Sequence, residues 1–193
     1  PDETFALNLT GPINAVIGYS TLMLDNIYGP LNAKQKEGLQ RTLKAARHLL
    51  ELVNDVLDLS KIEAGKIELS LQPVMFPSLI EDLFVTVRPL ADEYGSTLSL
   101  EMEAGEPFKV VSDPRRVRQI LLNLLSNAIK FGEGKPIRVV CKQTESKGVE
   151  IEVIDQGVGI AKDDISRIFE EFVQVSESKQ PGTGLGLPIS RRL

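Results

Sequence analysis

The chain of 193 residues is 42% hydrophobic and 25% charged, which suits one large domain or two small ones with buried cores. Its net charge of −5 argues against a general nucleic-acid or anionic-membrane binder, and no apolar run approaches the roughly 20 residues of a membrane span. Cys141 is the only cysteine, which excludes an intrachain disulfide.

The first 65 residues predict two amphipathic helices joined by a turn at Gly29-Pro30. The first helix carries Ile13, Val16 or Ile17, Ser20 and Leu24 on one face. In the second helix the apolar residues follow the alternating spacing of a coiled-coil seam: Leu39, Leu43, Ala46, Leu50, Val53 and Leu57. Two copies of such a hairpin would form a four-helix bundle, so we predict a dimerisation domain over 1–65. A helical arm packed on its own domain is the alternative.

Short strands alternate with helices over residues 66–193. A helix is expected over 76–94, interrupted near Pro89, and another runs from the Asp113-Pro114 start signal to Lys130. A third helix is expected to begin at Pro188. Strands are expected over 66–72, 97–103, 110–111, 137–143 and 149–154. The pattern predicts an α/β sandwich of the α+β class, with helices on one face of a mixed sheet.

Three polar residues share one face of the helix that begins after Asp113. Asn123 and Asn127 are four residues apart, and Lys130 lies three further on. Amide oxygens suit Mg²⁺, which bridges phosphate oxygens, and a lysine supplies a compensating charge. Taken alone, the asparagines could equally be solvent-facing helix residues.

Asp155 follows the last expected strand and precedes Gly157 and Gly159. A carboxylate at this position can accept a hydrogen bond from the amino group of adenine, and the glycines let the backbone approach the ring. The alternative is an ordinary turn at the end of a strand.

A third segment, Gly182-Thr183-Gly184-Leu185-Gly186, leads into the last expected helix. A glycine-rich loop before a helix suits phosphate binding, and the leucine between the glycines is unlike a flexible linker. The small and polar stretch 176–181 is expected to form a mobile lid. In this order and spacing the three segments describe one nucleotide pocket.

These motifs resemble the catalytic core of sensor histidine kinases over nearly the whole chain. Residues 123–131 are similar to the N box of that family, 155–159 to its G1 box, 169–172 to its F box and 182–187 to its G2 box. The resemblance implies a dimeric helical hairpin and an ATP-binding domain of the histidine kinase/Hsp90-like superfamily, over 66–193, with ATP and Mg²⁺ as cofactors. By this resemblance Asp155 binds adenine, Asn127 holds Mg²⁺ with Asn123 as a second ligand, and Gly182, Gly184 and Gly186 belong to the lid over the phosphates.

The first helix departs from the family at the phosphoacceptor motif. Leu7 stands at the histidine position and has no nucleophilic atom, and Asn8 replaces the acidic residue that assists proton removal. Gly11 replaces the threonine tied to phosphatase activity. His48, the only histidine, lies among apolar seam residues and is not expected to accept phosphate. The family also continues past the G2 box with a helix and two strands, so we expect a truncated ATP-binding domain.

Three functions can be weighed against these residues. The chain is expected to be a cytoplasmic ATP-binding core, or the cytoplasmic part of a membrane-anchored protein, that acts on or regulates a receiver domain or another kinase. The alternative is a pseudokinase scaffold that dimerises without phosphoryl transfer. A related ATPase of the topoisomerase, chaperone or mismatch-repair type is disfavoured, because Gln119 stands where those enzymes have a catalytic glutamate.

Overall fold

The computed structural model describes residues 3–103, 109–144, 146, 148–175 and 182–193, with side chains from Leu9 onward except that of Glu103. The expected lid over 176–181 and the side chains of Leu7 and Asn8 therefore lie outside the described residues. The chain divides into two compact units, Pro1–Ile67 and Glu68–Leu193. In the part that is described, no helix has the length and apolar character needed to cross a membrane.

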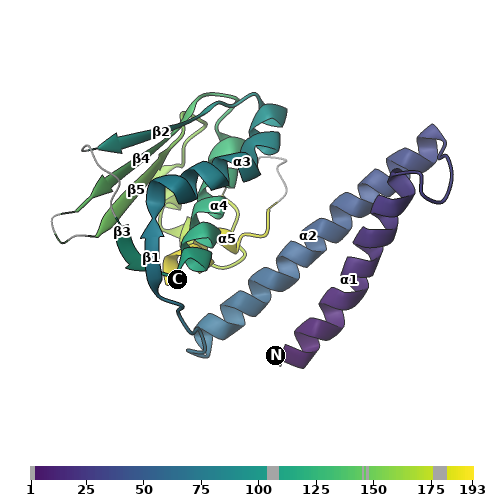
Figure 1. Ribbon diagram of the computed structural model, residues 1–193, viewed down its shortest axis with the longest axis horizontal. Helices are drawn as coiled ribbons and strands as arrows, with labels where there is room; N and C mark the ends of the chain where they lie inside the picture. The colour runs from purple at the N-terminus through teal and green to yellow at the C-terminus, as the bar shows by residue number, and fades with distance from the viewer. Residues whose placement is uncertain (1–2, 104–108, 145, 147, 176–181) are drawn as a thin grey trace. The chain divides into compact units, whose positions relative to one another are not determined.

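The first unit is an antiparallel hairpin of α1 (Glu3–Leu24) and α2 (Ala33–Glu63) (Figure 1). A capping box starts α2, because the side chain of Asn32 accepts from the backbone of Gln35 and the side chain of Gln35 accepts from the backbone of Asn32. Ile17 is the half-buried member of the Val16/Ile17 alternatives, whereas Val16 is 44% exposed. The most buried side chains of the hairpin are Ile13, Ser20, Ala46 and Leu59.

The second unit is built on the mixed sheet of β2 (Leu98–Glu103), β4 (Ile137–Gln143) and β5 (Val149–Ile154). The strands follow the order β2-β4-β5, with β2 parallel and β5 antiparallel to β4. Helices α3 (Phe76–Tyr94) and α4 (Pro114–Phe131) cover one face, which confirms the predicted fold class (Figure 1). The core between them includes the fully buried side chains of Ile80, Leu83, Leu125, Ile129, Ile137, Val139 and Cys141.

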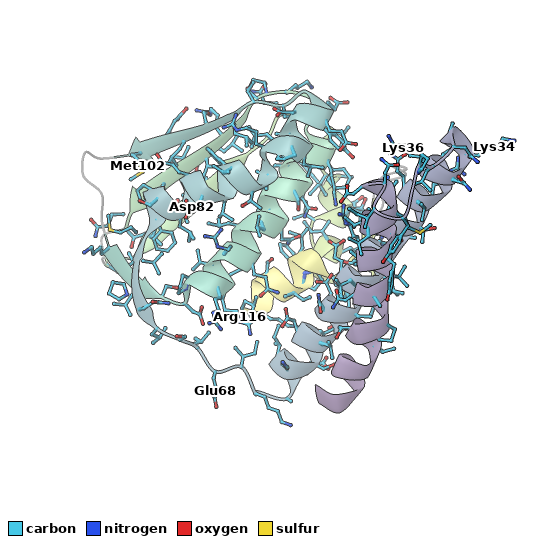
Figure 2. The ribbon with its side chains drawn as sticks, turned by 45° about the vertical axis from the view of Figure 1, so that its right-hand side comes forward. Lys34, Lys36, Glu68, Asp82, Met102 and Arg116 are labelled. Atoms are coloured by element: carbon cyan, nitrogen blue, oxygen red, sulfur yellow. The ribbon has the colours of Figure 1, made fainter. Side chains whose placement is uncertain are left out.

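A small antiparallel sheet pairs β1 (Gln72–Met75) with β3 (Lys109–Ser112). The strand predicted over 66–72 is wrong except at its last residue, because the register of β3 begins opposite Gln72. Before that point the chain, which includes Glu68, has no strand partner among the described residues (Figure 2). The alternation over 66–72 therefore reflected an extended connection rather than a sheet.

Helix α3 continues through Pro89, so the predicted interruption is wrong. Proline lacks the N–H that would bond the carbonyl four residues earlier, which here belongs to Val85. Pro89 is exposed and the side chain of Val85 is 72% exposed, so the missing bond lies on the solvent side. The opposite face of α3 is buried in the core and holds the helix together.

Candidate functional site

Asp113 fixes the start of α4, the helix that carries the predicted polar face. Its carboxylate accepts from the backbone N–H of Ser70 at 2.9 Å, of Arg115 at 2.9 Å and of Arg116 at 3.3 Å. These hydrogen bonds, that from Ser70 foremost, hold the pKa of Asp113 below its usual range against the opposing effect of burial. A buried N-cap with Pro114 at the first helical position sets where α4 begins and therefore which residues share each face.

Asn123, Asn127 and Lys130 are all half-buried on one side of α4. The amide nitrogen of Asn127 donates to the Oδ1 of Asn123 at 3.4 Å, so the two side chains meet. The helix spacing predicts that Leu121, Leu122, Leu124 and Leu125 fill the core. Leu121 and Leu125 are buried in it and Leu122 packs against it. Leu124 instead lines a cavity together with Ile120, one turn earlier on the same face.

The turn after β5 presents Asp155 to solvent and is seated on the end of α4. The Oδ1 of Asp155 accepts from the backbone N–H of Gly157 at 2.8 Å. The backbone N–H of Val158 donates to the carbonyl of Phe131 at 3.3 Å. A Cβ on Gly157 would overlap that same carbonyl, so glycine is required by the close approach of two backbones. Asp155 and Lys130 are thereby brought to the same end of α4.

A lysine that the sequence did not single out ties this turn to the α4–β4 connection. The Nζ of Lys135 donates to the carbonyl of Gln156 at 2.9 Å and pairs with the carboxylate of Glu133 at 2.8 Å. No sequence signal marks Lys135, because its contact depends on the placement of a turn 21 residues away.

The segment 182–185 is ordered by local hydrogen bonds. The backbone N–H of Leu185 donates to the Oγ1 of Thr183 at 3.1 Å, and the carbonyl of Gly182 accepts from the side chain of Gln174 at 2.7 Å. The side chain of Leu185 is fully buried. The loop before the last helix is therefore anchored by a core leucine and is not a flexible linker.

Gly184 braces this loop against the segment that resembles the F box. Its carbonyl accepts from the backbone N–H of Phe172 at 3.1 Å, and a Cβ on Gly184 would lie 2.9 Å from the carbonyl carbon of Phe172. Gly184 has a φ of 70°, and Phe172 has a φ of 63°, which is uncommon for a residue with a side chain. The two segments are thus cross-braced in backbone conformations that leave little room for substitution.

Helix α5 (Gly186–Arg192) begins two residues before the predicted start and packs on the polar face of α4. The amide nitrogen of Asn123 donates to the Oγ of Ser190 at 2.9 Å. A Cβ on Gly186 would meet the side chain of Asn123. Ser190 was not identified from the sequence, although it lies one turn after Gly186 on the same face of α5.

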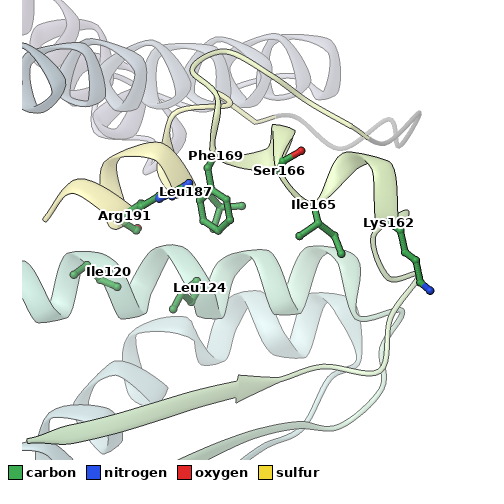
Figure 3. A pocket seen from close by; sticks show the side chains of 9 residues that line it. Ile120, Leu124, Lys162, Ile165, Ser166, Phe169, Leu187 and Arg191 are labelled. Carbon is green, nitrogen blue, oxygen red and sulfur yellow. The ribbon is translucent and has the colours of Figure 1, made fainter.

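An open cavity of about 790 Å³ lies beside these polar residues, between α4, α5 and the segment 162–169 (Figure 3). Its surface is mostly apolar, and the ring of Phe169 lies beneath the guanidinium of Arg191 at 5.0 Å. None of the residues predicted to bind nucleotide lines it. The lining residues are Ile120, Leu124, Lys162, Ile165, Ser166, Phe169, Leu187, Ser190 and Arg191.

Comparisons with known proteins match both units. Residues 9–65 match the His Kinase A (phospho-acceptor) domain, and residues 112–193 match the histidine kinase-, DNA gyrase B- and HSP90-like ATPase domain. The chain belongs to the histidine kinase family. The match to the first domain begins after Leu7 and Asn8, so it does not bear on the phosphoacceptor position.

Similar proteins support the same assignment. The non-motile and phage-resistance protein of Caulobacter vibrioides is 38% identical over 96% of the chain, and the aerobic respiration control sensor protein ArcB of Escherichia coli is 36% identical over 99%. The crystal structure of full-length ShkA in complex with AMPPNP superposes with a TM-score of 0.81, at 35% identity, over 98% of this chain and 39% of that one. The chain spans about a quarter of the length of the two curated relatives, 23% and 25% respectively.

The site of this histidine kinase core fits ATP and a magnesium ion. The ATPase-domain match implies ATP binding. The glycines at 157, 184 and 186 are required by close contacts within the protein, which hold the surrounding loops in place. Among the described residues the Oδ1 of Asn127 accepts no hydrogen bond, which leaves a hard oxygen donor for Mg²⁺. Gly159 is exposed, and a Cβ added there would have no neighbour within 4 Å. Lys130 makes no ion pair within the described part of the chain.

Proposed function

We propose that this chain binds Mg-ATP as the catalytic core of a sensor histidine-kinase-like signalling protein on the cytoplasmic side, where ATP is available. The observation that carries the proposal is the fixed turn that presents the exposed carboxylate of Asp155 at the C-terminal end of α4, the helix whose last two turns carry Asn127 and Lys130. Asp155 accepts from the amino group of adenine, Lys130 contacts phosphate, and the segment 182–186 approaches the phosphates. The Oδ1 of Asn127 would hold Mg²⁺, and the metal would offset the negative charge of the phosphates.

Calorimetric titration of Mg-ATP into the unsubstituted chain and into Asp155→Ala tests the adenine contact. Loss of a hydrogen bond to a charged group costs roughly 1.5–3 kcal/mol, so the affinity should fall about 10- to 100-fold. Asp92→Ala, which removes an exposed carboxylate from α3, is the matched control and should bind as the unsubstituted chain does. Equal affinities of Asp155→Ala and the control would refute the proposed role of Asp155.

We further propose that the chain does not phosphorylate itself by the usual route. Leu7 offers no atom that can attack the γ-phosphate, and Asn8 cannot take up a proton. The output of the ATP site would therefore act on or regulate a partner, either a receiver domain or another kinase. The relatives named as sensor proteins and kinases are consistent with such a partner.

Incubation with γ-labelled ATP, followed by acid treatment, separates this proposal from a pseudokinase scaffold. The unsubstituted chain is expected to carry no acid-labile label, and acid-labile label on it would contradict the proposal. The variant with Leu7→His and Asn8→Glu restores an imidazole and an acid, and it is expected to gain acid-labile label. If that variant also stays unlabelled while still binding ATP, the pseudokinase alternative is favoured.

We propose that the hairpin forms a homodimer. After α1 and α2 have packed together, apolar side chains one heptad apart remain exposed, Leu9 and Val16 on α1 and Leu49 and Val56 on α2. A second hairpin would bury these faces in a four-helix bundle. Sedimentation of a variant with Leu49→Glu and Val56→Glu should show a monomer. Val85→Glu, at an exposed apolar site on α3, is the matched control and should leave the dimer intact.

A further inference from the structure

Asn123 uses both ends of its side-chain amide within the protein. Its amide nitrogen donates to the Oγ of Ser190 at 2.9 Å, and its Oδ1 accepts from the amide nitrogen of Asn127 at 3.4 Å. A chain of hydrogen bonds thus runs from α5, through Asn123, to Asn127 on the next turn of α4.

Packing holds this amide in place. Gly186 lies so close that a Cβ there would be 2.8 Å from the Cγ of Asn123 and 3.0 Å from its amide nitrogen. The side chain is half-buried between two helices, so its rotamers are restricted. An oxygen that already accepts from Asn127 and faces a packed glycine is poorly placed to bind a metal ion directly.

The hydrogen bond between the asparagines also determines which end of Asn127 is available. Because the nitrogen of Asn127 donates to Asn123, the amide of Asn127 cannot rotate freely, and its Oδ1 points away from Asn123. This oxygen is the atom that suits Mg²⁺.

We propose that Asn123 is a positioning residue, and not a second magnesium ligand: held by Ser190 and Gly186 of α5, it orients the amide of Asn127 so that the Oδ1 of Asn127 faces the metal. The inference rests on the proposed role of Asn127 in binding Mg-ATP. It makes Ser190, at the far end of the chain of hydrogen bonds, a determinant of metal affinity without any contact to the metal.

Ser190→Ala distinguishes positioning from ligation. The measurement is the affinity for a fluorescent ATP analogue in Mg²⁺ and in excess EDTA, and the ratio of the two affinities gives the enhancement by the metal. Residues that orient a metal ligand typically change metal affinity by 10-fold or more when removed, so we expect the enhancement to fall about 10-fold while the metal-free affinity stays unchanged. If Asn123 were itself a ligand, freeing it from Ser190 would leave the enhancement the same or larger, and that result would overturn the proposal.

Ser126→Ala is the matched control, because the hydroxyl of Ser126 bonds the backbone carbonyl of Asn123 at 3.1 Å and not its side chain. It should leave the enhancement unchanged. In an Asn127→Ala background, Ser190→Ala should have no further effect, since the two residues act through one another. Two results would contradict the positioning role of Asn123 while leaving the ATP site intact: an equal fall in the enhancement with and without Asn127, or an equal loss of nucleotide affinity in EDTA. If the unsubstituted chain binds no nucleotide at all, the proposed function fails, and the positioning role fails with it.

Discussion

The turn after β5 and the helix α5 each press a glycine against α4, but against different kinds of atoms. Gly157 meets the backbone of Phe131, which cannot move without bending the end of the helix. Gly186 meets the side chain of Asn123, which can be displaced without bending the helix. The contact beneath the carboxylate that we propose for adenine is therefore rigid, whereas the contact at Asn123, beside the proposed metal ligand, involves a side chain alone.

Gly157→Ala is expected to have the largest effect. A Cβ would lie 2.6 Å from the carbonyl carbon of Phe131 and 2.9 Å from the Cα of Gly132, and no side chain can give way. We expect a loss of stability of about 3 kcal/mol or more, and an affinity for Mg-ATP lowered by roughly 100-fold, because the turn that carries Asp155 must move. Thermal unfolding and titration measure the two effects. Gly159→Ala is the control and should lower the Tm less, because the added Cβ has open space around it. An equal fall in Tm would show that backbone strain in the turn, and not contact with α4, causes the loss of stability.

Gly186→Ala should be milder and should act on the metal. The added Cβ displaces the side chain of Asn123, at a cost of about 1–3 kcal/mol. We expect a fall in the enhancement of ATP affinity by Mg²⁺, with little change in EDTA. An effect as large as that of Gly157→Ala, both in Mg²⁺ and in EDTA, would mean that the two glycine contacts are equally rigid.

Asp113→Asn perturbs α4 at its other end, away from both glycines. Since the pKa of Asp113 is lower in the folded chain than in the unfolded chain, its carboxylate stabilises the fold at pH values above the unfolded pKa of about 3.9. That stability is lost as the pH falls through the folded pKa. The Tm of the variant should therefore lie below that of the unsubstituted chain at pH 7, and the two should converge in acid. A gap that stays constant down to pH 2 would exclude ionisation of Asp113 as the cause.

Lys135→Met should have the smallest effect. The side chain is partly exposed, so loss of its bond to the Gln156 carbonyl should cost under about 1 kcal/mol and lower the affinity only a few-fold. Because Lys135 supports the turn that carries Asp155, adenosine and ATP should lose affinity by the same factor. Lys109→Met, at an exposed lysine of β3, is the control, and a loss seen for ATP alone would point instead to a phosphate contact.

Local sequence signals were sufficient where a segment carried its own pattern. The strands expected over 137–143 and 149–154 coincide with β4 and β5, and the Asp113-Pro114 signal marks the start of α4. The strand expected from residue 66 failed because its pairing is decided by β3, and the break at Pro89 failed because the core face of α3 outweighs one missing hydrogen bond.

Contacts across the chain are what sequence reasoning missed in the site. The bond between Asn123 and Ser190 joins residues 67 apart, and that between Lys135 and Gln156 joins residues 21 apart. Within their own segments, Ser190 and Lys135 look like ordinary polar residues. Their contacts form only when α5 and the turn after β5 are folded against α4.

The only cysteine of the chain gives the ATP-binding unit an internal reporter of its own unfolding. Cys141 is fully buried on the core side of β4, and burial raises the pKa of its thiol, so little thiolate is available to react in the folded state. Labelling by a thiol reagent at neutral pH therefore counts opening events of this sheet, without an introduced probe. Ligands that tighten the unit should slow the labelling in proportion to their binding, while association of the hairpins alone should not.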